Sequence, residues 1–196
     1  MRILLIALLS ICCTFVYSQK KGKKEQNLDE YPLKARMVLG KSTDSILAMH
    51  WLMPEAKAMY EGKKKPDTDT ATFSILAKSY GADAETRPLY IHLLMYTNWV
   101  ATEGALADSL GKYDMKLLER FPKEVIRYFK KAETDKRIED AEKAFQYNIA
   151  FELNGMDDPD SAFDDYADKV TKVFRSKDTD PLDKLMKGIQ KQMKKK

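Results

Sequence analysis

Apolar positions recur mainly at intervals of three and four residues from Leu28 to the end of the chain. This spacing places apolar side chains on one face of an α-helix, and no run of alternating apolar and polar residues competes with it. The pattern predicts an all-α fold of about seven to nine helices, arranged as antiparallel hairpins in an irregular bundle. A short α-solenoid-like stack is the alternative, although no repeat of about 34 or 40 residues is present.

Local start and stop signals give bounds for these helices. Asp, Thr and Pro residues mark the starts, and Gly residues mark several of the ends. Pro54 either kinks the second helix or starts a new one after Met53. The predicted segments are Asp29 to Leu39 ended by Gly40, Asp44 to Tyr60 ended by Gly62, Asp69 or Thr70 to Tyr80 closed by Gly81, 87–100 after the capping Thr86, 106–121, 122–131, Thr134 to Leu153 ended by Gly155, Asp158 to Phe174, and a last helix from Thr179 or Asp180.

The segment 87–100 is the most apolar part of the chain outside the N-terminus. Leucine, isoleucine, methionine and aromatic residues fill most of its positions and leave little polar face. A helix that is apolar nearly all round is a buried helix. We therefore predict that this helix forms the centre of a single helical domain spanning residues 28–196.

The first 18 residues have the pattern of a cleavable secretory signal peptide. Arg2 supplies a positive start, residues 3–16 are almost wholly apolar, and the predicted cut lies between Ser18 and Gln19. An uncleaved anchor or a buried helix is the alternative, but a run of about 14 apolar residues is short for spanning a bilayer. Residues 19–27 are polar and lysine-rich, and they are predicted to be a disordered lead-in. We expect export to the periplasm or out of the cell.

Cleavage at this point would remove Cys12 and Cys13, the only cysteines in the chain. The exported protein would then lack disulfides and thiol chemistry, and neither cysteine follows the small residue of a lipoprotein signal. A chain of the remaining length buries about 70% of its unfolded surface, so a hydrophobic core suffices for folding. The formal net charge of +4 reflects a surface of mixed sign, which disfavours nucleic acid as a partner.

The candidates for acid–base or nucleophilic catalysis are His50 and His92. Both lie in apolar helical sequence without the context of a catalytic triad, so each is expected to be hydrogen-bonded in the interior. No His-Glu-x-x-His motif and no glycine-rich phosphate loop occur. Met49, Met53 and Met59 suggest copper, but His50 lies about 100° around the helix from Met49 and methionine is common in protein cores. We predict no catalytic, cofactor-binding or metal-binding residues.

A cluster of aspartates suggests calcium binding. Its members are Asp157, Asp158, Asp160, Asp164, Asp165 and Asp168. They lack the spacing of an EF-hand loop and its final glutamate. Aspartates at a helix start cap the first backbone amides and lie near the positive end of the helix dipole. Capping and a solvated helix face are therefore the favoured interpretation, with weak calcium binding as the alternative.

The C-terminal segment 181–196 combines an apolar stripe with many lysines. The stripe consists of Leu182, Leu185, Met186, Ile189 and Met193. Such a helix either lies on an anionic membrane surface or packs on the core, with its lysines near the negative end of the helix dipole. Because the stripe contains no aromatic residue to sit at a membrane interface, packing on the core is favoured.

Taken together, these patterns favour an exported, non-enzymatic helical protein that acts by binding a partner, either another protein or a component of the envelope. One alternative is a small secreted hydrolase, which requires His50 or His92 to lie in a cleft beside a carboxylate or a hydroxyl. The other is a peripheral protein held at a membrane surface by residues 181–196, which requires the apolar stripe to be accessible.

Overall fold

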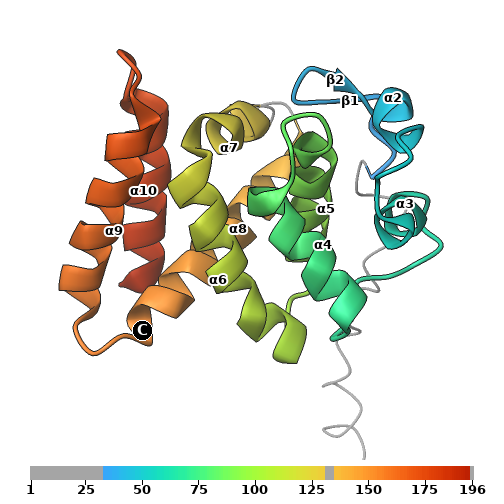
Figure 1. Ribbon diagram of the computed structural model, residues 1–196. Helices are drawn as coiled ribbons and strands as arrows, with labels where there is room; N and C mark the ends of the chain where they lie inside the picture. Colours follow the sequence, from blue (N-terminus) through green and yellow to red (C-terminus); the bar gives the residue numbers. More distant parts are fainter. Residues whose placement is uncertain (1–32, 131–134, 195–196) are drawn as a thin grey trace, which may run out of the picture.

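The computed structural model describes residues 33–130 and 135–194, which form a helical bundle with a small two-stranded sheet (Figure 1). The predicted leader, the predicted lead-in and the predicted cap Thr134 lie outside the described residues. The elements are β1 (Met37–Val38), β2 (Lys41–Ser42), α2 (Thr43–Leu47), α3 (Pro54–Tyr60), α4 (Thr70–Gly81), α5 (Arg87–Val100), α6 (Ala105–Arg120), α7 (Pro122–Phe129), α8 (Lys136–Asn154), α9 (Pro159–Phe174) and α10 (Asp180–Met193). Within the described residues there are nine helices, and the predicted all-α irregular bundle is confirmed.

Helices α5 and α8 lie at the centre of the bundle. Every residue of α5 from Pro88 to Trp99 is buried, as its apolar sequence predicts. Helix α4 packs along α5, while α8 contacts α5, α6 and α10. Figure 1 shows α6 and α8 between α9 and α10 on one side and α4 and α5 on the other. One continuous cluster of buried side chains runs from Leu33 to Met193.

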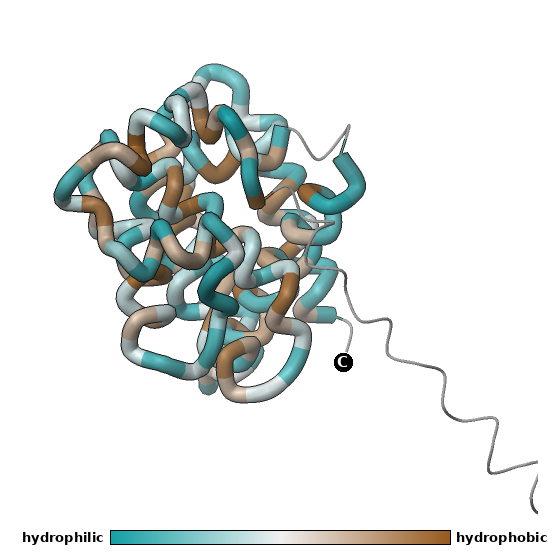
Figure 2. The backbone as a smooth tube through the Cα atoms, turned by 90° about the vertical axis from the view of Figure 1, so that its right-hand side faces the viewer, coloured by the Kyte–Doolittle hydropathy of each residue, from teal (hydrophilic) through white to brown (hydrophobic). Residues whose placement is uncertain are grey.

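Hydrophobic and hydrophilic positions alternate in short stretches along the helices (Figure 2). This alternation is expected where each helix has one buried face and one solvated face. Across residues 33–130 and 135–194, none of the helices combines the length and the hydropathy needed to cross a bilayer.

Several helix ends follow the local signals in the sequence. The Asp69 carboxylate accepts a hydrogen bond from the Thr72 backbone N–H at 2.6 Å, and Asp158 accepts one from Ser161 at 3.2 Å. Gly62 follows α3 with φ at +76°, a conformation that glycine adopts without strain. The predicted starts of α4 and α9 and the predicted end of α3 are therefore confirmed.

The predicted helix over 29–39 is wrong for the part that the structure describes. Residues 37–42 form a hairpin in which Val38 lies opposite Lys41. Leu39 and Gly40 connect the strands with φ values of +51° and +83°, as a two-residue turn of the type favoured in hairpins requires. Gly40 therefore makes a turn and does not end a helix. Strands of two residues carry no periodic signal, and the turn lacks the Asn-Gly or Asp-Gly pair that usually marks such a hairpin.

The predicted helix 44–60 divides into α2 and α3. Helix α3 begins at Pro54, so the proline starts a new segment and does not kink a longer helix. Helix α2 begins one residue before the predicted cap Asp44, because Ser42 caps it by accepting a hydrogen bond from Ser45 N–H at 3.4 Å. Asp44 lies instead in the first helical turn.

Two further caps differ from the prediction. Helix α8 is capped by Asp135, whose carboxylate accepts a hydrogen bond from Arg137 N–H at 3.0 Å. Thr86 occupies the N-cap position of α5 without capping it through its side chain. Its hydroxyl and backbone N–H instead donate to the Asp83 carboxylate at 2.8 and 3.1 Å. At α8 an aspartate therefore caps the helix, whereas at α5 the Thr86 side chain is bound to Asp83 and caps nothing.

A fully buried polar cluster joins α5, α6 and α8. The Asp114 carboxylate accepts hydrogen bonds from the side-chain amides of Asn98 at 2.9 Å and Asn148 at 3.1 Å. Asn148 also donates to the Asn98 side-chain oxygen at 3.3 Å. Because the site is closed to water, burial raises the pKa of Asp114 well above 3.8. Helices α6 and α8 approach closely here, since a Cβ added to Gly111 would lie 2.5 Å from the Asn148 carbonyl oxygen.

The apolar stripe of α10 packs against α8 and α7. All five of its members are buried, from Leu182 to Met193. The stripe is therefore part of the core, which agrees with the favoured interpretation of the C-terminal segment. The accessible stripe that the membrane-surface alternative requires is not seen.

Candidate functional site

A cavity of about 410 Å³ opens between the N-terminal hairpin and the helical bundle. The residues that line it come from the hairpin, α5, α7 and the start of α8: Ala35, Met37, Val38, Leu39, Gly40, His92, Arg127, Tyr128, Asp135 and Ile138. Apolar groups make up most of the lining, with polar groups at a few points only. Small-ligand sites typically have this size and this composition.

The hairpin side of the cavity, residues 35–40, forms a wall held by partly buried hydrogen bonds. The Thr43 hydroxyl donates to the Ala35 carbonyl oxygen at 2.6 Å, and the Tyr60 hydroxyl from α3 donates to the same oxygen at 2.9 Å. Thr43 is fully buried, so water does not compete strongly for these bonds. The wall is therefore held in place before any ligand binds.

His92 joins three segments at the cavity. Its Nδ1 lies 2.7 Å from the Tyr128 hydroxyl, and its Nε2 lies 2.9 Å from the Leu33 carbonyl oxygen. Because a carbonyl oxygen can only accept, Nε2 carries a proton, and in the neutral ring Nδ1 then accepts from the Tyr128 hydroxyl. Both ring nitrogens are engaged, so His92 connects α5 to α7 and to Leu33, just before the wall.

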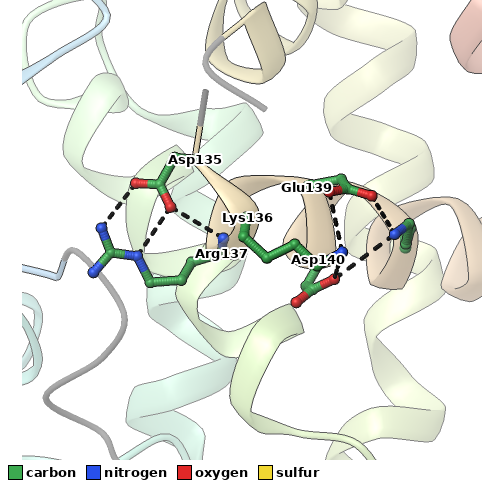
Figure 3. Close-up of polar contacts among 6 residues, drawn as sticks. Asp135, Lys136, Arg137, Glu139 and Asp140 are labelled. Atoms are coloured by element: carbon green, nitrogen blue, oxygen red, sulfur yellow. Dashed lines mark hydrogen bonds and ion pairs between the residues drawn. The ribbon is translucent and has the colours of Figure 1, made fainter. Parts of the chain in front are cut away.

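The negative charge of Asp135, the acidic residue of the cavity, is balanced by a neighbouring arginine. The Asp135 carboxylate accepts hydrogen bonds from Arg137 Nε and Nη2, both at 2.9 Å, in the bidentate arrangement shown in Figure 3. These bonds with Arg137 lower the pKa of Asp135 from 3.8, so the pair keeps its charges at neutral pH. The cavity therefore gains little net charge from Asp135.

Arg127 is the remaining charged side chain of the lining. It is exposed to solvent while it lines the cavity, which places it at the mouth. The carboxylate one helical turn earlier, Glu124, is bound instead to Arg87 by two hydrogen bonds of 2.8 and 3.1 Å. In the described part of the chain, no carboxylate lies within 4.0 Å of the Arg127 guanidinium.

The two candidate histidines have different surroundings. His92 is buried beside a hydroxyl and lines the cavity, as the interior interpretation predicts. The same prediction is wrong for His50, which is exposed in the turn after α2, with its ring 4.8 Å from the ring of Trp51. His50 lies outside α2 and α3 because the helix predicted around it ends at Leu47. The structure does not bring the two histidines together at the cavity.

The candidate copper and calcium ligands do not converge either. Met49 and Met53 lie between α2 and α3, whereas Met59 is fully buried inside α3. In the aspartate cluster, Asp158 caps α9 and the other members are exposed. Among the described residues, no group of three or more His, Cys, Asp or Glu side chains could hold a metal ion.

The sequence did not reveal Arg127, Tyr128 or Asp135 as site residues, because each is ordinary in its local context. The cavity combines residues 35–40 with side chains from three helices that follow much later in the chain. Comparison with known proteins adds no relative: no family model, no curated protein and no solved structure matches the chain. The function must therefore be argued from the cavity itself.

Proposed function

We propose that the protein is an exported, non-enzymatic binding protein whose cavity receives an apolar group of its ligand. The observation that carries this proposal is a cavity of about 410 Å³ with a mostly apolar lining. Moving an apolar group from water into such a site is favourable by about 25 cal/mol per Å² of buried apolar surface. The leader-like sequence of residues 1–18 supports export.

The arrangement of polar groups supports binding over catalysis. Both ring nitrogens of His92 hold other parts of the protein, and the Asp135 carboxylate holds Arg137. A general base must reach a substrate proton at about 2.6–3.2 Å, so His92 would first have to give up Tyr128 or Leu33. The hydrolase stays a prediction that requires this rearrangement.

The proposal is tested by filling the cavity. 1-Naphthylamine, a neutral fluorophore small enough for the cavity, should gain fluorescence with the purified protein. Ala35→Phe places a ring in the cavity and should abolish that gain, whereas Ala71→Phe, at a half-buried position on α4 outside the lining, should preserve it. Circular dichroism checks that both variants are folded. Equal fluorescence in the two folded variants, or none with the parent protein, would contradict the proposal.

A protein partner is the second candidate, and an exposed aromatic pair on α8 favours it. Tyr147 and Phe151 are 57% and 50% exposed, and their rings stack with centroids 6.3 Å apart. Aromatic side chains are enriched at the centres of protein interfaces. If this face binds a protein, the double variant Tyr147→Ser/Phe151→Ser should lose a partner that the parent protein captures from the native envelope or medium. A partner retained by that variant would exclude this face.

A further inference from the structure

We infer that the ligand of the cavity is a small amphiphile with one carboxylate, and that Arg127 binds this carboxylate at the mouth. The inference rests on the proposed function, because it assigns the chemistry of a ligand that the cavity is proposed to hold. It follows from the charges around the cavity, from the position of Arg127 and from the size of the apolar space.

The charges of the lining leave one cation uncompensated. Asp135 and Arg137 form a bidentate pair, so their charges cancel locally. Glu124, the carboxylate nearest to Arg127 along α7, is held by Arg87, which itself packs over the Phe121 ring at 3.8 Å. Lys123 on α7 and Lys130 just after it are exposed and positively charged, so they repel Arg127 rather than pair with it. A ligand with a single negative charge therefore matches the site.

The guanidinium group favours a carboxylate as the ligand's charged end. Its planar arrangement of N–H donors binds two carboxylate oxygens at once, as Arg137 binds Asp135 within this protein. Because Arg127 lies at the mouth, the carboxylate can stay partly hydrated while it binds. This position avoids the large cost of burying an unpaired charge.

The apolar part of the ligand is limited by the volume of the cavity. At roughly 30 Å³ per non-hydrogen atom, a value close to that of liquid water, 410 Å³ holds roughly a dozen such atoms. The side chains of Val38 and Ile138 lie on the lining, while the polar edges of His92 and Tyr128 are bonded to each other. A saturated chain of about ten carbons satisfies both the size and the polarity of this space.

Calorimetric titration with two ligands tests the assignment. Decanoate carries the proposed headgroup, and methyl decanoate is its neutral counterpart. With the parent protein, decanoate should bind about ten times more tightly than the ester. Arg127→Gln should remove this preference by weakening decanoate about ten-fold while leaving the ester unchanged. Lys123→Gln, which removes another exposed cation from α7, should leave both affinities unchanged.

The outcomes separate the inference from the proposed function. If both ligands bind equally and Arg127→Gln changes neither affinity, the carboxylate assignment is wrong while the apolar cavity stands. If neither ligand binds the parent protein and the neutral fluorophore also fails, the proposed function is wrong. If decyl phosphate binds far more tightly than decanoate, the carboxylate assignment is wrong and the headgroup of the ligand is a phosphate. If a peptide ending in leucine binds the cavity more tightly than decanoate, the ligand is the C-terminus of a protein and the assignment of a small amphiphile is wrong.

Discussion

Helix α5 carries two buried polar clusters, and they differ in how closely the segments around them pack against one another. Asn98, near its C-terminal end, joins Asp114 and Asn148 where α5, α6 and α8 meet and α6 approaches α8 closely. His92, less than two turns earlier, joins Tyr128 and Leu33 beside the cavity. The first cluster lies between long helices, and the second lies where a short hairpin takes the place of a helix.

The difference shows how this fold makes room for a ligand. Gly111 lets α6 and α8 come close enough to exclude water from the Asp114 cluster. The hairpin offers only a few side chains to the bundle, so space remains beside His92. Polar side chains hold the helices together in both places, and the cavity lies on the hairpin side.

The largest expected effect is at the close contact of α6 and α8. In Gly111→Ala the new Cβ would lie 2.5 Å from the Asn148 carbonyl oxygen, which belongs to the backbone and cannot move aside cheaply. We expect a loss of about 3 kcal/mol in the free energy of unfolding, measured by urea denaturation. Gly81→Ala is the matched control, since nothing lies within 4 Å of its added Cβ, and it should gain about 0.5 kcal/mol. Equal urea midpoints for the two variants would mean that α6 and α8 can accommodate the added Cβ at Gly111.

The next effect is a pH dependence that arises from the Asp114 cluster. Burial raises the pKa of Asp114 above its unfolded value near 3.8, so the folded protein holds a proton that the unfolded chain releases. The resulting stabilisation is complete below about pH 4 and is lost as pH rises towards the folded pKa. The slope is at most about 1.4 kcal/mol per pH unit.

Asp114→Asn removes this titration and keeps the shape of the side chain. Urea unfolding of both proteins between pH 4 and pH 8 should show the parent losing stability relative to the variant as pH rises. Parallel pH profiles would show that Asp114 titrates in the same way in the folded and unfolded states.

A smaller effect is expected at the cavity cluster. Tyr128→Phe removes the hydroxyl that donates to His92 Nδ1, and we expect a loss of about 1 kcal/mol. The loss stays small because a water molecule in the adjacent cavity can take the place of the hydroxyl. Tyr147→Phe, at an exposed tyrosine, should leave thermal stability unchanged. A loss for Tyr128→Phe as large as that for Gly111→Ala would remove the contrast between the two clusters.

The smallest effect is expected at the surface of α8, away from both clusters. Lys143 contacts Glu139 and lies 3.8 Å from Asp140, while Lys136 bridges the same two carboxylates at 3.0 and 3.2 Å (Figure 3). Because solvent screens this network, Lys143→Ala should leave the urea midpoint unchanged within error at physiological salt. A clear destabilisation would show that polar contacts outside the core also hold the bundle.

Much of the bundle could be predicted because its signals are local. The apolar residues of α5, the caps Asp69 and Asp158 and the stripe of α10 are each visible within one segment of sequence. The interactions that form these features extend over one or two helical turns, so the spacing of apolar and capping residues alone indicates the structure. The hairpin escaped prediction because two-residue strands have no period and because its turn begins with Leu39.

The cavity could not be predicted because it depends on contacts between distant segments. His92 and Leu33 are 59 residues apart, and His92 and Tyr128 are 36 apart. Asp114 carried a weak signal, since it lies between Tyr113 and Leu117 on a helix whose buried face also holds Gly111. A charged residue on that face predicts a buried partner but does not say which helix supplies it.

The hairpin wall also has a consequence for the order of folding. The bond between His92 and Leu33, just before the wall, closes a loop of 59 residues, whereas helices α4 and α5 are neighbours along the chain and pack directly on each other. Closing a loop of this length costs entropy before native contacts compensate for it, so we expect the wall to dock after the bundle has formed. Amide hydrogens of residues 37–42 should then exchange with solvent sooner than those of α5. The rate of that exchange measures how often the protein uncovers its own cavity.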